Sequence, residues 1–286
     1  MKVVRTKLTY GLEALAGVLA VLFLFPIYLV LINSGKSSFE ITANPTALPA
    51  DWMQIIRNMQ RIWSDPNILY GSSFQSSVII TVFSLLLVIV ISGMAAWVLV
   101  RTKSTVSNII FLVMVAAMVI PFQIVMLPLV AWFRLFHQVT GILLLRTYHG
   151  MILAYIGFGL SLSVFILHGF IKGIPYELEE AAIIDGCSKP AVFFRIVFPL
   201  LRPVNATILI LHGIWIWNDY LLPLIVLGRG NRIQTIPLAV ANFAGAYVKQ
   251  WDLILTSILM AMIPVIIVFL FAQKHIMRGI IAGSIK

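Results

Sequence analysis

Six long apolar runs constrain the fold of this chain more than any other feature. Each is about 20 residues long, the length of helix that crosses the hydrocarbon core of a bilayer. Hydrophobic residues make up 61% of the sequence and charged residues only 10%, which excludes a soluble domain with a polar surface. We predict an all-α integral membrane protein with six transmembrane helices, at residues 12–32, 78–100, 109–133, 150–170, 204–227 and 253–273.

Basic side chains beside these runs predict how the chain is oriented. With six spans, one side of the membrane receives both termini and the loops near 101–103 and 171–203, which carry most of the Lys and Arg residues. Short loops rich in Lys and Arg stay on the cytoplasmic side. We therefore expect a multi-pass plasma (inner) membrane protein of bacterial or archaeal type, with both termini cytoplasmic. The formal charge of +10 is spread along the chain, so we expect membrane lipids as partners and no nucleic acid.

The segment 175–186 concentrates acid in a chain that otherwise consists of apolar spans and basic loops. Pro175 suits the first position of a helix, and glutamates such as Glu177 and Glu180 then lie in the first turns, where the helix dipole favours negative charge. Gly186 is well placed to end the helix in a left-handed conformation. We expect a short helix here, followed by a tight turn and a second short helix, on the cytoplasmic face.

Small residues at the centre of this segment favour contact with another protein. Ala181 and Ala182 let a second surface approach closely, while Glu180 offers a carboxylate to a cation on that surface. Asp185 adds a second polar contact or braces the turn. An acidic helix lying on the membrane is the alternative, but an anionic cytoplasmic leaflet disfavours acidic side chains. We therefore predict a helix that docks onto a partner protein.

These residues resemble a known family motif. Glu180-Ala181-Ala182, Asp185-Gly186 and the run 194–200 have the residue types and spacing of the EAA loop of ABC importer permeases. Similar matches at 215–220 and 278–286 extend the resemblance over essentially the whole chain. It looks like the carbohydrate-type subfamily, specifically the smaller permease subunit of maltose and glycerol-3-phosphate importers.

The resemblance implies one transmembrane permease domain over residues 1–286, with a coupling loop at 171–203. Together with a second homologous permease subunit, the chain would form the translocation pathway for a sugar or sugar-like solute. Two ATPase subunits would bind ATP and Mg²⁺, and an extracytoplasmic solute-binding protein would deliver the solute. The ATPases would act on the coupling residues Glu177, Glu180, Ala181, Ala182, Asp185 and Gly186.

The chain itself has no recognisable catalytic motif. Gly35-Lys36-Ser37 resembles the end of a Walker A loop, but that motif needs a glycine five positions earlier, where Val30 stands inside a predicted span. The His residues are scattered without ligand-like spacing, and the sequence has a single Cys. We expect no catalytic, cofactor-binding or metal site in this chain, and ATP hydrolysis on separate subunits.

Asp219 is the carboxylate that lies far along a predicted span. An ionisable residue in such a place is a candidate functional residue, and with Trp215 and Asn218 it would line a polar route for a hydroxylated solute. The same residues also suit helix packing and an outer aromatic belt. The pathway hypothesis predicts that Asp219→Asn lowers transport and leaves assembly unchanged.

Other classes of protein are alternatives to the importer permease. A stand-alone secondary transporter should show internal inverted repeats and coupling groups at the membrane midplane, and neither is evident. A membrane-embedded enzyme would need a catalytic constellation of side chains. Within the ABC class, glycerol-3-phosphate or another polar solute is an alternative cargo, although a phosphate site should gather Arg or Lys.

Overall fold

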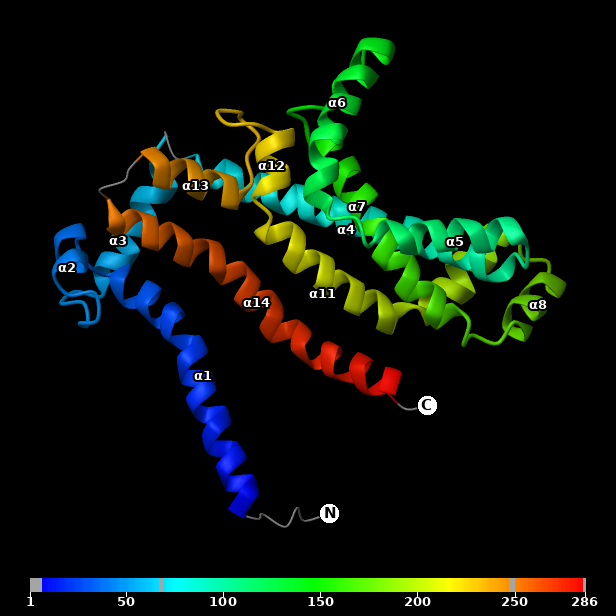
Figure 1. The fold of residues 1–286 in the computed structure, drawn as a ribbon, viewed down its shortest axis with the longest axis horizontal. Helices are drawn as coiled ribbons and strands as arrows, with labels where there is room; N and C mark the ends of the chain where they lie inside the picture. Colours follow the sequence, from blue (N-terminus) through cyan, green and yellow to red (C-terminus); the bar gives the residue numbers. More distant parts are fainter. Residues whose placement is uncertain (1–6, 67–68, 247–249, 285–286) are drawn as a thin grey trace. The chain divides into compact units, whose positions relative to one another are not determined.

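The computed structural model describes residues 7–66, 69–246 and 250–284, and every regular element assigned within these ranges is helical (Figure 1). The all-α prediction is therefore confirmed for the described residues. The helices are α1 (Lys7–Asn33), α2 (Ser38–Ala43), α3 (Met53–Ser64), α4 (Tyr70–Arg101), α5 (Thr105–Ala117), α6 (Phe122–Thr140), α7 (Tyr148–Ile171), α8 (Glu177–Ile184), α9 (Lys189–Val192), the π-helix η1 (Phe193–Val197), α10 (Phe198–Leu200), α11 (Arg202–Asn218), α12 (Leu221–Val226), α13 (Ile236–Ala246) and α14 (Trp251–Ser284).

Five of the described helices are long and apolar enough to cross a membrane, namely α1, α4, α6, α7 and α14. The count rises to six if Lys189–Leu200 and Arg202–Asn218, which are bent by 75° relative to each other, form one span. The described helices thus provide five or six candidate spans, where the sequence predicted six.

Two of the predicted spans were wrong as continuous helices. The span at 109–133 is divided, because α5 ends at Ala117 and α6 begins only after Pro121. Proline lacks an N–H group and disfavours helical dihedrals in the residue before it, which accounts for the break. The span at 204–227 is divided at Asp219, where the backbone leaves the helical region with ψ of 129°.

Contacts between Cα atoms divide the chain into two compact units. The first consists of Met1–Gly71 and Ala239–Pro264, and the second of Ser72–Leu238 and Val265–Lys286. In the first unit the Lys36 ammonium is buried and donates hydrogen bonds to Asn33 Oδ1 at 2.9 Å and to the Asn44 carbonyl at 3.0 Å. The lysine of the Walker-like tripeptide therefore stabilises the loop that follows α1 by hydrogen bonds within the chain.

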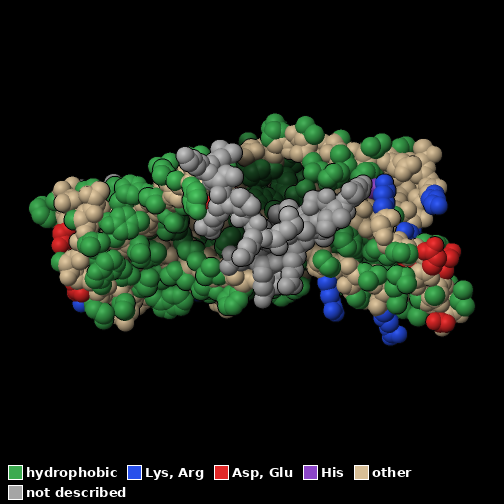
Figure 2. All heavy atoms as spheres, turned by 90° about the horizontal axis from the view of Figure 1, so that it is seen from below, with side chains coloured by type: hydrophobic (Ala, Val, Ile, Leu, Met, Phe, Trp, Pro, Cys, Tyr) green, Lys and Arg blue, Asp and Glu red, His purple; other side chains and the backbone are tan. Residues whose placement is uncertain are grey.

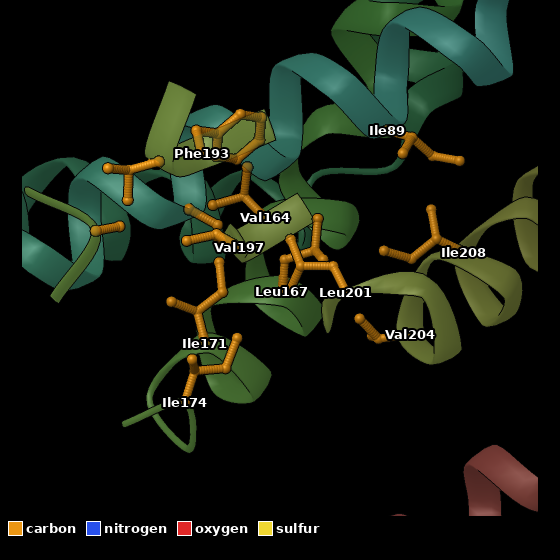
Figure 3. Packing of buried hydrophobic residues seen from close by; sticks show 13 residues of the cluster. Ile89, Val164, Leu167, Ile171, Ile174, Phe193, Val197, Leu201, Val204 and Ile208 are labelled. Atoms are coloured by element: carbon orange, nitrogen blue, oxygen red, sulfur yellow. The ribbon is translucent and has the colours of Figure 1, made fainter. Parts of the chain in front are cut away.

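The second unit has a core of buried apolar side chains from α4, from α7 and from the helical segments that run from α8 to α11, both included (Figure 3). Leu167 and Ile171 of α7 lie close to Val197 of η1 and to Leu201, just before α11. The ring of Phe193 also packs on Trp97 of α4, with 5.5 Å between centroids. Residues 171–203 are therefore anchored by their apolar side chains to the helices of this unit.

Helix α7 starts in close contact with the backbone of the loop before it. The Thr147 hydroxyl donates to the Leu144 carbonyl at 2.7 Å and accepts from the Gly150 N–H at 3.2 Å. A Cβ atom on residue 150 would lie 1.8 Å from the Leu144 carbonyl oxygen. This approach requires glycine at position 150.

Candidate functional site

Helix α8 occupies the acidic segment, as the sequence predicted, but it starts later. The helix begins at Glu177, and the carbonyl of Tyr176 accepts the first hydrogen bonds, from the N–H groups of Glu179 at 2.9 Å and Glu180 at 3.1 Å. The prediction that Pro175 takes the first helical position was therefore wrong by two residues. The acidic side chains still fall in the first turn, where the helix dipole favours them.

The end of α8 matches the prediction. Gly186 has a φ of 85°, in the left-handed region that favours glycine. Its N–H donates to the Ile183 carbonyl at 2.9 Å, and the Cys187 N–H donates to the Ala182 carbonyl at 2.9 Å. This pair of hydrogen bonds is a Schellman motif. It terminates α8 sharply before the next helical run begins at Lys189.

One face of α8 is exposed along its whole length. Glu177, Glu180, Ala181 and Ile184 follow the i, i+3, i+4, i+7 spacing of a single helical face, and all four are exposed. Ile184 has 85% of its surface exposed, a large value for an apolar side chain. Asp185 and Gly186 extend this exposed surface beyond the helix. We call these six residues the outer face of α8.

The end of the second unit that carries α8 is rich in charge. Figure 2 shows acidic and basic side chains gathered at this end, at the right of the view. The exposed basic residues of the segment around α8 are Lys172, Lys189, Arg195 and Arg202. The outer face of α8 thus carries three carboxylates and the exposed Ile184 side chain, and exposed basic residues lie before and after it in the chain.

The opposite face of α8 is buried in its own unit. Ala182 is 7% exposed and belongs to the apolar core, so its small side chain allows close packing within the chain. Glu179 is 2% exposed, and its carboxylate accepts hydrogen bonds from Trp97 Nε1 and Arg101 Nε, both at 2.9 Å. Of the two alanines predicted to face a partner, Ala181 is exposed, whereas Ala182 is packed inside its own unit.

Sequence reasoning missed the role of Glu179. The signal was available in the helical spacing, because Glu179 and Ala182 are three residues apart and share the face opposite Glu180 and Ala181. Helical spacing could not identify the partner of Glu179, because Arg101 lies 78 positions earlier in the chain.

A cavity of about 960 Å³ lies in the second unit, between the ends of α5 and α6 at their break and the helices α7 and α11. Most of its lining is apolar and aromatic, with Phe122, Trp132, Phe158 and Trp215 among the lining residues. Its polar side chains include those of Gln123, Ser161 and His212. Phe122 and Trp215 meet edge to face, with 6.1 Å between ring centroids.

The three predicted pathway residues have different surroundings. Trp215 lines the cavity, whereas Asn218 and Asp219 do not appear in its described lining. Asn218 is exposed, and its amide donates to the Ile214 carbonyl at 2.8 Å. Asp219 is 8% exposed and accepts from Tyr155 Oη at 3.1 Å and from the N–H groups of Leu221 and Leu222 at 3.0 and 3.4 Å. Asp219 therefore caps α12 and joins it to α7.

These contacts predict that Asp219→Ala destabilises the protein. The substitution removes the acceptor of the first two N–H groups of α12 and leaves the buried Tyr155 hydroxyl without this acceptor, so we expect a loss of about 2 kcal/mol of stability. Asp219→Asn should cost less, because the amide oxygen can still accept from Leu221 and Leu222. Thermal unfolding in detergent measures both variants. Wild-type stability combined with lost transport in Asp219→Ala would instead support the pathway hypothesis.

The chain is similar over much of its length to a family of membrane transport proteins. The model of the family described as "Binding-protein-dependent transport system inner membrane component" matches residues 89–282.

Among the residues that the structure describes, no group of three or more His, Cys, Asp or Glu side chains could hold a metal ion.

Two relatives are similar to this chain over almost all or all of its length. The chain is 41% identical over 278 residues, 97% of both chains, to the probable starch degradation products transport system permease protein AmyC of Thermoanaerobacterium thermosulfurigenes. It is 33% identical over 287 residues, 100% of both chains, to the melibiose/raffinose/stachyose import permease protein MelC of Bacillus subtilis.

Two solved structures share the fold. A chain of a bacterial ABC transporter involved in the import of the acidic polysaccharide alginate superposes with a TM-score of 0.73 at 23% identity, covering 94% of this chain and 97% of that one. A second structure, of a bacterial alginate ABC transporter in complex with an alginate pentasaccharide-bound periplasmic protein, gives a TM-score of 0.67 at 16% identity, with 94% of each chain covered.

Proposed function

Because the chain belongs to the family of binding-protein-dependent transport system inner membrane components and is a permease subunit of an ABC importer, we propose that its solute is an oligosaccharide. The similarity over 97% of the chain to a permease named for starch degradation products carries this proposal. The second relative, named for melibiose, raffinose and stachyose, supports the same class of solute.

The cavity beside Trp215 is the part of this subunit that we assign to the solute pathway. Aromatic rings offer flat apolar surfaces to the C–H faces of a sugar, and a few polar groups such as Gln123, Ser161 and His212 can bind its hydroxyls. The described lining includes no Lys or Arg, so this cavity does not favour a phosphorylated solute. Asn218 and Asp219 would contribute to the pathway from the end of α11, next to the cavity-lining residue Trp215.

The outer face of α8 is the surface that we assign to ATPase coupling. Glu177, Glu180 and Asp185 offer carboxylates, while Ala181 and Gly186 allow close approach. Ala182 would contribute from inside, by holding α8 on the core. The basic side chains around α8 favour a cytoplasmic position for this loop, and with it cytoplasmic termini.

The complete importer would contain this chain as one permease domain, a second homologous permease and two ATPase subunits that bind ATP and Mg²⁺. An extracytoplasmic binding protein would bring the oligosaccharide. We assign no ATP hydrolysis to this chain, because the family to which it belongs is that of the transport subunit.

Copurification followed by uptake tests the proposal. The tagged chain, purified from native membranes in mild detergent, should bring along an ATPase and a second permease identified by mass spectrometry. The complex in proteoliposomes should import labelled maltotriose or raffinose when ATP and the binding protein are present, and should not import a labelled monosaccharide. Recovery of the chain alone, with transport that needs no ATP, would favour the secondary transporter.

A further inference from the structure

Glu179 is a buried carboxylate whose partners all lie outside α8. Trp97 and Arg101 of α4 are four positions apart, so their side chains leave the same face of that helix and reach the same carboxylate. Trp97 Nε1 lies 2.9 Å from Glu179 Oε2, and the Arg101 guanidinium donates from Nε at 2.9 Å and lies within 2.7 Å of Oε1 through Nη2. Both carboxylate oxygens are thus held by the end of one candidate membrane span.

Arg101 also holds the chain just before α8. Its Nη2 donates to the Ile174 carbonyl at 3.0 Å, and its guanidinium carbon lies 5.4 Å from the centre of the Tyr176 ring. A guanidinium with several fixed partners has little freedom to reorient, because each hydrogen bond constrains its planar fork. The last turn of α4 is therefore joined to α8 by the Glu179 carboxylate, and to the residues just before α8 by the Ile174 carbonyl and the Tyr176 ring.

We propose that Glu179 is a positioning residue of the importer, which transmits movement of α8 directly to the end of α4 through Trp97 and Arg101. The inference rests on the proposed function, because it assumes that an ATPase acts on the outer face of α8. Glu179 and Glu180 are neighbours in sequence with opposite tasks. Glu180 faces the partner, and Glu179 fixes α8 to a membrane span.

Burial makes this link suited to carrying a displacement. A buried carboxylate that loses its cation is left with an uncompensated charge, so α8 and α4 are expected to move together instead of separating. Hydrogen bonds between charged groups are also about twice as strong as neutral ones. The alternative route runs along the chain, from α8 through α9 and η1 to α11, and crosses the 75° bend before α11.

The test measures solute imported per ATP hydrolysed, in the complete complex in proteoliposomes. Glu179→Gln keeps the size of the side chain and removes its charge, and Trp97→Phe removes one N–H donor while it preserves ring packing on Phe193. For Glu179→Gln we expect about a tenfold lower import per ATP, the size of a typical coupling between sites, with unchanged subunit composition and continued ATP hydrolysis. Trp97→Phe should lower the ratio less.

A double substitution tests whether the two side chains act through one shared contact or lower import per ATP independently. Glu179→Gln combined with Trp97→Phe should lower import per ATP no further than Glu179→Gln alone, because the Trp97 N–H acts through the same carboxylate. Asp51→Asn is the matched control, since it makes the same change at an exposed carboxylate of the first unit. It should leave the ratio unchanged.

Three results would overturn the proposal: an unchanged ratio in Glu179→Gln, additive losses in the double variant, or loss of subunit assembly and ATP hydrolysis together in both Glu179→Gln and Trp97→Phe. The last result would make the contact a requirement for folding alone. Failure of the proposed function looks different, because in that case no ATPase copurifies with the wild-type chain.

Discussion

Glu180→Lys is expected to release the ATPase subunits or to uncouple ATP hydrolysis from uptake. The side chain lies on the outer face of α8, and its carboxylate is free of the buried contacts that Glu179 makes. A lysine there would place a positive charge opposite the cation that we expect on the partner, and like charges at an interface cost several kcal/mol. Uptake by reconstituted complexes should fall about 100-fold, and the amount of copurified ATPase reports whether docking is lost.

The matched control for this prediction is Asp51→Lys. Asp51 is also an exposed carboxylate, pairs with Arg57 on the surface of the first unit, and lies outside the proposed docking surface. Exposed ion pairs contribute little to stability, so the control should keep its ATPase subunits. Coupled uptake by Glu180→Lys at the wild-type rate would contradict the assignment of α8.

Gly150→Ala is expected to have the largest effect on stability. The added methyl group would lie 1.8 Å from the Leu144 carbonyl oxygen, a distance that no side-chain rotation can relieve because both groups belong to the backbone framework. The loop or the start of α7 must therefore move, which would cost about 3 kcal/mol or more. Size-exclusion chromatography after heating in detergent measures the change in unfolding temperature.

Gly169→Ala provides the comparison within the same helix. A Cβ atom at residue 169 would meet nothing within 4 Å, so the substitution should be neutral or slightly stabilising through the higher helix propensity of alanine. A similar loss in both variants would mean that α7 is sensitive to any added methyl group, and would contradict the role of the Leu144 contact.

The apolar runs predicted the membrane helices well because a bilayer imposes one simple requirement, a long stretch of residues without charge. The two divided spans show where that requirement is insufficient. The average over about 20 residues stays apolar across Pro121 and Asp219. The helix is nevertheless interrupted at both, since Pro121 lacks a backbone donor and Asp219 accepts from the N–H groups that follow it. Window length alone does not report such local hydrogen bonding.

The acidic segment was easier to place than to interpret. Its helix, its first-turn glutamates and its glycine cap follow from local rules, and the structure agrees with them apart from the start of the helix. The division into an inner and an outer face depends on Trp97 and Arg101, which are distant in sequence. The cavity likewise needs four helices together, so its residues could not be grouped from their spacing.

The opposed side chains of α8 also limit how this region can change in length. Inserting or deleting one residue between Ile174 and Glu179 would rotate the rest of the helix by about 100° relative to its anchor on α4. An insertion would then place Leu178 beside Arg101, and a deletion would place Glu180 there. In both cases a different set of side chains would be offered to a partner. Substitutions on the outer face can alter the strength of docking, whereas a single insertion would alter which side chains of α8 face the partner.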